Sequence, residues 1–169
     1  MRRVLVVGNL ASGKSALARQ LGARVALPVY HLDRHFWRSA WTMPDKEEWR
    51  AWVDDIISKP SWVLDGNYVS SLPRRAARAD MIVFINIPWT TALYRYIVRS
   101  IRRTREGQGD IPSDASEAIR WRNVRAILRF SREILPIISE ACAVIPNAVV
   151  FRSTEDALTW VRGLPASDA

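Results

Sequence analysis

The sequence predicts an α/β fold in which helices cover both faces of a parallel β-sheet. Short apolar runs rich in β-branched residues alternate with segments of helical periodicity along the whole chain, a pattern typical of parallel sheets. The length of 169 residues, of which 49% are hydrophobic, favours one domain with its own core. Because ligands of such sheets bind beyond the carboxyl ends of the strands, the residues that follow each strand are the first candidates for function.

Five apolar runs are the predicted strands. They are short, and most of them end at a glycine, a proline or an aspartate, which are residues that interrupt regular structure. They cover residues 3–7, 29–32, 62–64, 81–87 and 149–151.

Helices are expected between these strands. The first covers residues 14–21. The second begins with a capping Thr42, an early Pro44 and an acid at Asp45, and it stops before Pro60. Further helices are expected from about residue 90, from 113 to 136, and after a cap formed by Ser153 with Asp156.

The net charge of +8 indicates anionic ligands. Arginines supply most of this charge, and ten of them lie between Arg95 and Arg132 against four acids. No apolar run approaches the roughly 18 residues that a membrane span needs. The single cysteine, Cys142, cannot form an internal disulfide, which fits a reducing compartment. We therefore expect a cytoplasmic protein, a monomer or homodimer, with no membrane partner.

A phosphate-binding P-loop is the clearest motif. The sequence GNLASGKS at residues 8–15 matches G-x-x-x-x-G-K-[ST] in full, directly after a predicted strand and at the start of a predicted helix, which is the context that the motif requires. This context argues against a chance match in a glycine-rich turn. Lys14 would reach the β- and γ-phosphates of ATP and act in catalysis, while Ser15 would ligate Mg²⁺. The expected nucleotide-binding residues here are Gly8, Ala11, Ser12, Gly13, Lys14, Ser15 and Ala16.

Two aspartates follow the second and third predicted strands. Asp65 ends the run Trp62–Asp65, and a carboxylate there would hold Mg²⁺ beside the P-loop. The alternative is that Asp65 and Gly66 only form a turn. Asp33 is the candidate to position or deprotonate an acceptor hydroxyl, with a helix cap or an ion pair as the equal alternative. His31, on the same predicted strand, is interpreted as structural.

Aromatic residues cluster after the second strand, at Phe36, Trp37 and Trp41. Their rings would stack on a planar acceptor such as a nucleobase. Packing within an inserted helical lobe is an equally good interpretation.

Arginines recur at helical spacing on both sides of a segment that contains Gly107, Gly109 and Pro112. This arrangement predicts a lid that closes over the phosphates and neutralises the charge that develops during transfer. For any single arginine, a solvated helix face is the favoured alternative. The first helix contributes the candidate catalytic residues Arg99, Arg102 and Arg103 with Arg95 and Arg105 beside them, and the second helix contributes Arg122, Arg125, Arg129 and Arg132.

Five segments together resemble the DNA topology modulation proteins, relatives of adenylate kinase. They are GNLASGKS, HLDRHFW, SWVLDGNYVSSLPRR, ADMIVFINIPW and VVFRSTEDALTW, in this order over nearly the whole chain. The resemblance implies a P-loop NTPase fold of three layers, like that of nucleoside monophosphate kinases, with strand order 2-3-1-4-5. It also implies a small acceptor lobe at about residues 34–59 and a lid at about 102–114.

The resemblance also bears on single residues. Asp65 with Gly66 matches the Asp-Gly after the third strand of nucleoside monophosphate kinases, but Asn67 and Tyr68 stand where those enzymes continue with proline and arginine. Arg152 resembles a residue of the loop that lies against adenine. Asn86 stands where relatives often carry an aspartate, so we assign it no metal.

The sequence thus predicts an ATP-dependent phosphotransferase that moves the γ-phosphoryl of ATP with Mg²⁺ to a small acceptor, with a nucleotide as one candidate. A kinase for a sugar or a hydroxy acid shares the fold and differs only in the acceptor pocket. A nucleic-acid-associated protein, with the P-loop as a switch and the arginine helix on phosphates, is the less favoured alternative, since the sequence shows no DNA-binding motif.

Overall fold

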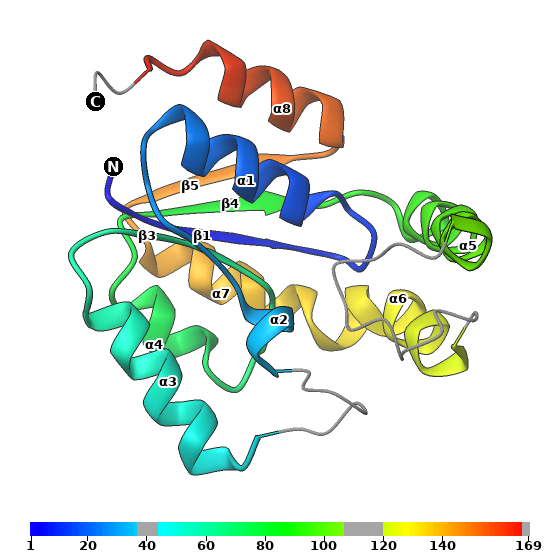
Figure 1. Ribbon diagram of the computed structural model, residues 1–169, viewed down its shortest axis with the longest axis horizontal. Helices are drawn as coiled ribbons and strands as arrows, with labels where there is room; N and C mark the ends of the chain where they lie inside the picture. Colours follow the sequence, from blue (N-terminus) through cyan, green and yellow to red (C-terminus); the bar gives the residue numbers. More distant parts are fainter. Residues whose placement is uncertain (37–43, 107–119, 167–169) are drawn as a thin grey trace.

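The computed structural model describes residues 1–36, 44–106 and 120–166, with the backbone alone for 103–106. A sheet of five parallel strands in the order β2-β3-β1-β4-β5 forms its centre (Figure 1). This confirms the predicted α/β class and the strand order that the resemblance implied. The strands are β1 (Arg3–Gly8), β2 (Val29–His31), β3 (Trp62–Asp65), β4 (Met81–Ile85) and β5 (Asn147–Phe151).

Helices pack on both faces of the sheet (Figure 1). One face carries α1 and α8, and the other carries α3, α4 and α7, while α5 and α6 contact each other beyond the sheet. Their bounds are α1 (Lys14–Arg24), α2 (Leu32–Phe36), α3 (Lys46–Ser58), α4 (Leu72–Ala76), α5 (Trp89–Glu106), α6 (Trp121–Glu133), α7 (Leu135–Val144) and α8 (Thr154–Gly163). Within these described ranges, none of the helices has the length and apolar character to cross a bilayer.

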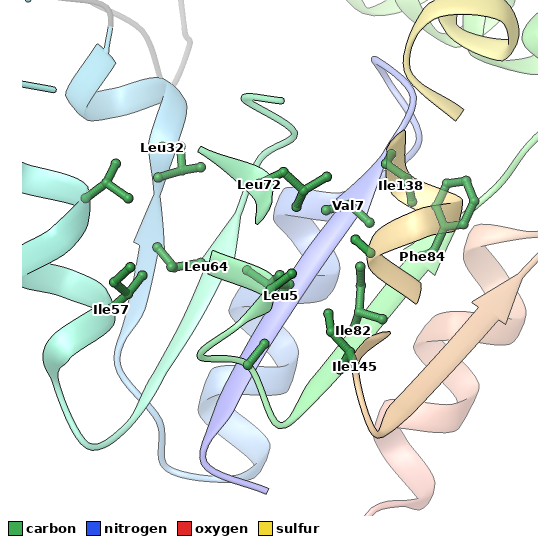
Figure 2. Packing of buried hydrophobic residues seen from close by; sticks show 14 of the residues in the cluster. Leu5, Val7, Leu32, Ile57, Leu64, Leu72, Ile82, Phe84, Ile138 and Ile145 are labelled. Atoms are coloured by element: carbon green, nitrogen blue, oxygen red, sulfur yellow. The ribbon is translucent and has the colours of Figure 1, made fainter. Parts of the chain in front are cut away.

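Strand β1 is apolar because it is covered on both sides. Val4 and Val6 belong to the core under α1 and α8, whereas Leu5 and Val7 belong to the core on the opposite face. Figure 2 shows Leu5 and Val7 among the side chains of that second core. A strand buried on both faces loses the alternation of polar and apolar residues, which explains the continuous run that the sequence shows.

The structure corrects several predicted boundaries. Asp45, and not Thr42, caps α3, because its carboxylate accepts hydrogen bonds from the N–H groups of Glu47 and Glu48 at 2.7 and 2.9 Å. Strand β2 ends at His31, so Asp33 lies in the short helix α2 and not at a strand end. Thr42 lies outside the described residues. The predicted cap of the last helix is confirmed, since Ser153 Oγ accepts the Asp156 N–H at 3.0 Å.

The long helix predicted from about residue 113 toward Pro136 ends slightly earlier, and a further helix that the sequence did not predict follows it. Residues 113–119 of the predicted helix lie outside the described residues. Helix α6 ends at Glu133, and α7 begins at Leu135 with Pro136 in its first turn. Proline lacks a backbone N–H, so it is tolerated where a first-turn N–H has no helical partner. Pro136 therefore starts a helix here, where the sequence prediction took it as the end of one.

Candidate active site

The P-loop backbone takes the curled form that the motif predicts. Ala11 and Gly13 have φ values of 58° and 86°, in the left-handed region, and the Ser12 N–H donates to the Asn9 carbonyl at 3.1 Å. A Cβ atom at Gly13 would lie 2.5 Å from Thr154 Cγ2, and one at Gly8 would lie 2.7 Å from the carbonyl oxygen of Ile85. This packing requires glycine at both positions, and the left-handed backbone favours it at Gly13 as well.

The loop leads into the N-terminus of α1. Lys14 is the first residue of this helix and is 9% exposed, while Ser15 and Ala16 are half-buried in the first turn. The first turn contains no acidic residue, and Gly13 provides no side-chain cap. Such an end is suited to an anion, since the helix dipole and the first N–H groups favour negative charge. Ser12 Oγ, buried in the loop, has no hydrogen-bond partner within the described part of the chain.

Side chains from distant segments hold the loop in place. The Asn67 amide accepts the Gly8 N–H at 3.0 Å and donates to the Gly8 carbonyl at 2.8 Å. Thr154 Oγ1 donates to the Ser12 carbonyl at 2.9 Å and accepts a hydrogen bond from the Arg95 guanidinium. The sequence noted Asn67 only as a departure from related kinases, and its role in joining the segment after β3 to the P-loop was missed.

Asp65 lies at the carboxyl end of β3, in register with Val6 of β1 and His31 of β2. Asp65 as a whole is 3% exposed. Oδ2 lies 2.7 Å from His31 Nδ1, whereas Oδ1 is buried without a hydrogen-bond partner among the described residues. An unpartnered carboxylate oxygen is costly to bury, so this atom fits a ligand to a cation. Gly66, next in the chain, has φ 136°, so the segment is also a turn that favours glycine.

A metal ion here would depend on few protein ligands. Within residues 1–36, 44–106 and 120–166, no group of three or more His, Cys, Asp and Glu side chains is placed to hold one. A Mg²⁺ ion commonly keeps several waters and binds through one or two carboxylates plus substrate phosphates. The single oxygen of Asp65, with Ser15 as the second candidate ligand, fits that mode of binding.

Asp33 is exposed on α2, and its Oδ1 accepts a hydrogen bond from the Tyr68 hydroxyl at 2.8 Å. Burial, and then the nearby Asp33 carboxylate, raise the pKa of Tyr68 above its usual value. The phenol therefore remains protonated and keeps donating at neutral pH. The other carboxylate oxygen of Asp33 is left for solvent or a ligand, because the residue is exposed.

A buried arginine braces the segment that carries these groups. Arg75 is fully buried, and its guanidinium donates to the carbonyls of Gly66 at 2.9 Å and Tyr68 at 3.1 Å, to that of Asn67, and to Ser71 Oγ at 3.1 Å. Burial lowers the pKa of Arg75 to about 9. Sequence reasoning missed this residue, although the pair of arginines directly after the loop was a visible signal.

The structure gives Phe36 a packing role. Its ring lies 4.9 Å from that of Trp49 and 4.7 Å from that of Tyr68, between centroids, and it packs against the core. This favours the packing interpretation over stacking on an acceptor. Trp37 and Trp41 lie outside the described residues.

The predicted arginines occupy different environments. Arg95 is engaged with Thr154 beside the P-loop, Arg99 is half-buried, and Arg102 is exposed on α5. Arg129 pairs with Glu133 at 3.2 Å on the surface of α6, as expected of a solvated helix face. Arg152 is exposed just before the Ser153 cap of α8. The side chains of Arg103 and Arg105 and nearly all of the predicted lid lie outside the described residues.

Comparison with known proteins supports the fold. No protein-family model and no curated protein sequence matches this chain. Solved structures of three shikimate kinases are similar to it along almost its whole length. At 13–18% identity, this likeness shows that the fold is shared.

The three similar structures come from bacteria of different genera. The shikimate kinase from Acinetobacter baumannii in complex with shikimate has 17% identity and a TM-score of 0.60, over 96% of this chain and 89% of that one. The enzyme from Aquifex aeolicus has 18% identity and a TM-score of 0.55, over 95% and 93%. The enzyme from Bacteroides thetaiotaomicron has 13% identity and a TM-score of 0.57, over 95% and 96%.

Proposed function

We propose that this protein is an ATP-dependent kinase that transfers the γ-phosphoryl group of ATP to a small acceptor. The observation that carries the proposal is the pairing of a P-loop with a buried, unpartnered carboxylate oxygen. The curled backbone of residues 8–13 leads into the N-terminus of α1, and Asp65 Oδ1 lies at the end of the neighbouring strand. This combination is what a nucleotide with a divalent cation requires.

Each residue of the proposed nucleotide site has a separate task. The P-loop N–H groups and Lys14 bind the phosphates, and Arg152 lies on the segment that the resemblance places against adenine. Ser15 and Asp65 would hold Mg²⁺, which when bound neutralises charge on the β- and γ-phosphates. Arg99, Arg102 and Arg103 on α5 would approach the transferred phosphoryl group when the segment at about 102–114 closes as a lid.

Asp33 would act on the acceptor, on what we call the acceptor side of the site. Its exposed carboxylate is oriented by Tyr68, and it would accept the proton of an acceptor hydroxyl as that oxygen attacks the γ-phosphorus. A small hydroxylated acceptor is consistent with the similar structure that contains shikimate. A nucleotide acceptor, bound by the proposed lobe at about residues 34–59, is the second candidate within the same reaction.

Exposed arginines on α6 favour a second candidate function, binding of nucleic acid. Arg122, Arg125 and Arg132 are exposed beside Trp121, which is 69% exposed. The kinase is preferred because a nucleic-acid binder has no need for the Asp33–Tyr68 pair. Non-specific DNA binding falls steeply with salt, whereas phosphoryl transfer to a small acceptor responds far less.

The test is consumption of ATP by the purified protein in the presence of Mg²⁺ and one acceptor at a time. Small hydroxy acids, sugars and nucleoside monophosphates form three arms, and Asp33→Asn is the matched control. We expect one arm to stimulate turnover well above the acceptor-free rate, and the stimulation to be lost in Asp33→Asn. Salt-sensitive DNA binding with no stimulation in any arm would favour the second candidate instead.

A further inference from the structure

His31 and Asp65 form a buried pair at the edge of the proposed nucleotide site. The two atoms in contact are His31 Nδ1 and Asp65 Oδ2, 2.7 Å apart, and the side chains are 11% and 3% exposed. Within the described residues, the Asp65 carboxylate makes this hydrogen bond through Oδ2 and none through Oδ1. A contact with so little solvent access is not weakened by competition with water.

The sheet itself creates this contact. His31 and Asp65 are register partners on the adjacent parallel strands β2 and β3, so their side chains extend from the same face of the sheet. The side chain of Val6 of β1, the register partner of Asp65 on its other side, is apolar and offers no hydrogen bond. The geometry of the pair is therefore set by strand pairing, which is more rigid than a loop.

The hydrogen bond makes the two oxygens of Asp65 inequivalent. A free carboxylate exposes both oxygens, and rotation about its terminal bond exchanges them. Here Oδ2 is held by the imidazole, while Oδ1 remains buried and unpartnered. A donor that occupies one oxygen leaves the other with a defined direction.

We propose that His31 is a positioning residue that orients Asp65 so that Oδ1 serves as the ligand for the divalent cation of the bound nucleotide. The inference rests on the proposed function, since it concerns the metal that would accompany ATP. Partners that orient a metal ligand through a hydrogen bond contribute to metal affinity without contacting the ion. The interpretation of His31 as merely structural predicts instead that its loss changes stability alone.

The test measures the binding of ADP at a series of Mg²⁺ concentrations and in EDTA by titration calorimetry. His31→Phe keeps a ring of similar size but removes the donor, whereas His31→Asn places an amide N–H near the position of Nδ1. We expect His31→Phe to raise the Mg²⁺ concentration for half-maximal strengthening of ADP binding by about 10- to 100-fold. Affinity for ADP in EDTA should not change, and His31→Asn should restore most of the loss.

Controls separate this effect from unfolding. Tyr30→Phe alters the neighbouring residue of β2 and should leave the Mg²⁺ dependence as in the parent. His31→Leu replaces His31→Phe if the larger ring prevents folding, as judged by Tm. Mn²⁺ in place of Mg²⁺, followed by electron paramagnetic resonance of the bound ion, reports the same change without any turnover.

The outcomes distinguish this inference from the function on which it rests. A parent protein that binds ADP equally well with and without Mg²⁺ overturns the proposed metal site and the inference together. A Mg²⁺-dependent parent with an identical dependence in His31→Phe overturns the inference alone. Equal losses in the Phe and Asn variants would show that the ring, and not its hydrogen bond, is what matters.

Discussion

The nucleotide side and the acceptor side of the candidate site differ in how their polar groups are held. The P-loop is joined to the segment after β3 by two hydrogen bonds of Asn67 and to α8 by Thr154, and Asp65 is buried. Asp33, in contrast, is exposed and is oriented by one phenol. The nucleotide side is thus preorganised by the sheet, whereas the acceptor side is open to solvent.

This difference has a physical reason. A buried polar group needs a hydrogen-bond partner, either from the protein or from a ligand. A triphosphate presents the same chemical groups to every protein of a fold that binds it, so a site for it can be built from buried, fixed groups. An acceptor varies in shape, so its site is made from side chains on short helices and loops. Changes on the two sides should therefore alter different measurements.

The largest effect is expected on the nucleotide side, from Lys14→Ala. Loss of a preorganised positive group at the transferring phosphates should lower kcat by at least about 10²- to 10³-fold. Lys14 belongs to neither of the two hydrophobic clusters, so Tm should change little. Steady-state ATP turnover measures the effect, and a variant with parental turnover would show that the P-loop does not carry out the chemistry.

Arg75→Met removes the hydrogen bonds that hold the segment of residues 66–68, which carries both Asn67 of the nucleotide side and Tyr68 of the acceptor side. Removal of the guanidinium leaves the carbonyls of Gly66 and Asn67 without this donor, at about 1–3 kcal/mol for each, so the free energy of unfolding should fall by about 2 kcal/mol or more. Urea denaturation measures this loss. Arg78→Met, at an exposed position nearby, is the matched control and should change stability by less than about 0.5 kcal/mol. Similar values for the two variants would contradict the role given to Arg75.

Tyr68→Phe sharpens the comparison because it affects the acceptor side alone. The ring and its packing remain, but Asp33 loses the donor that orients it. A hydrogen bond to a charged group contributes about 1.5–3 kcal/mol, so we expect kcat/KM for the acceptor to fall by roughly 10-fold or more, with the KM for ATP unchanged. If the KM for ATP rises as kcat/KM for the acceptor falls, the nucleotide side and the acceptor side are not independent.

The smallest effect is expected at the amino end of the sheet, remote from both sides. Hydrogen bonds from Arg3 hold the pKa of Asp80 below its usual value. The folded pKa thus lies below the unfolded one, so the stabilisation is present above about pH 4 and is lost as pH falls through the folded pKa. Asp80→Asn should lower stability at pH 7 by at most about 1 kcal/mol and leave turnover unchanged. Thermal melts of parent and variant at pH 7 and pH 3 should converge at the lower pH.

Much of the fold was predictable because it depends on local pattern. The run Val4–Val7 ends at Gly8, and its burial on both faces follows from apolar residues without alternation. The P-loop was predictable for the same reason, since its glycines, Lys14 and Ser15 are adjacent in the chain. The strand order came from resemblance to a known family, and the cap of α3 was misplaced because Thr42 and Asp45 are both good capping residues.

The sequence by itself determined the P-loop, the parallel sheet and the end of β3 at Asp65, because each depends on residues within a few positions of one another. Only the tertiary structure decided that His31 contacts Asp65, that Tyr68 holds Asp33 and that Asn67 joins Gly8. These partners are 34, 35 and 59 residues apart, and strand order and register bring them together. Hydrogen bonds between such distant side chains depend on orientations within fractions of an ångström, which composition and periodicity do not encode.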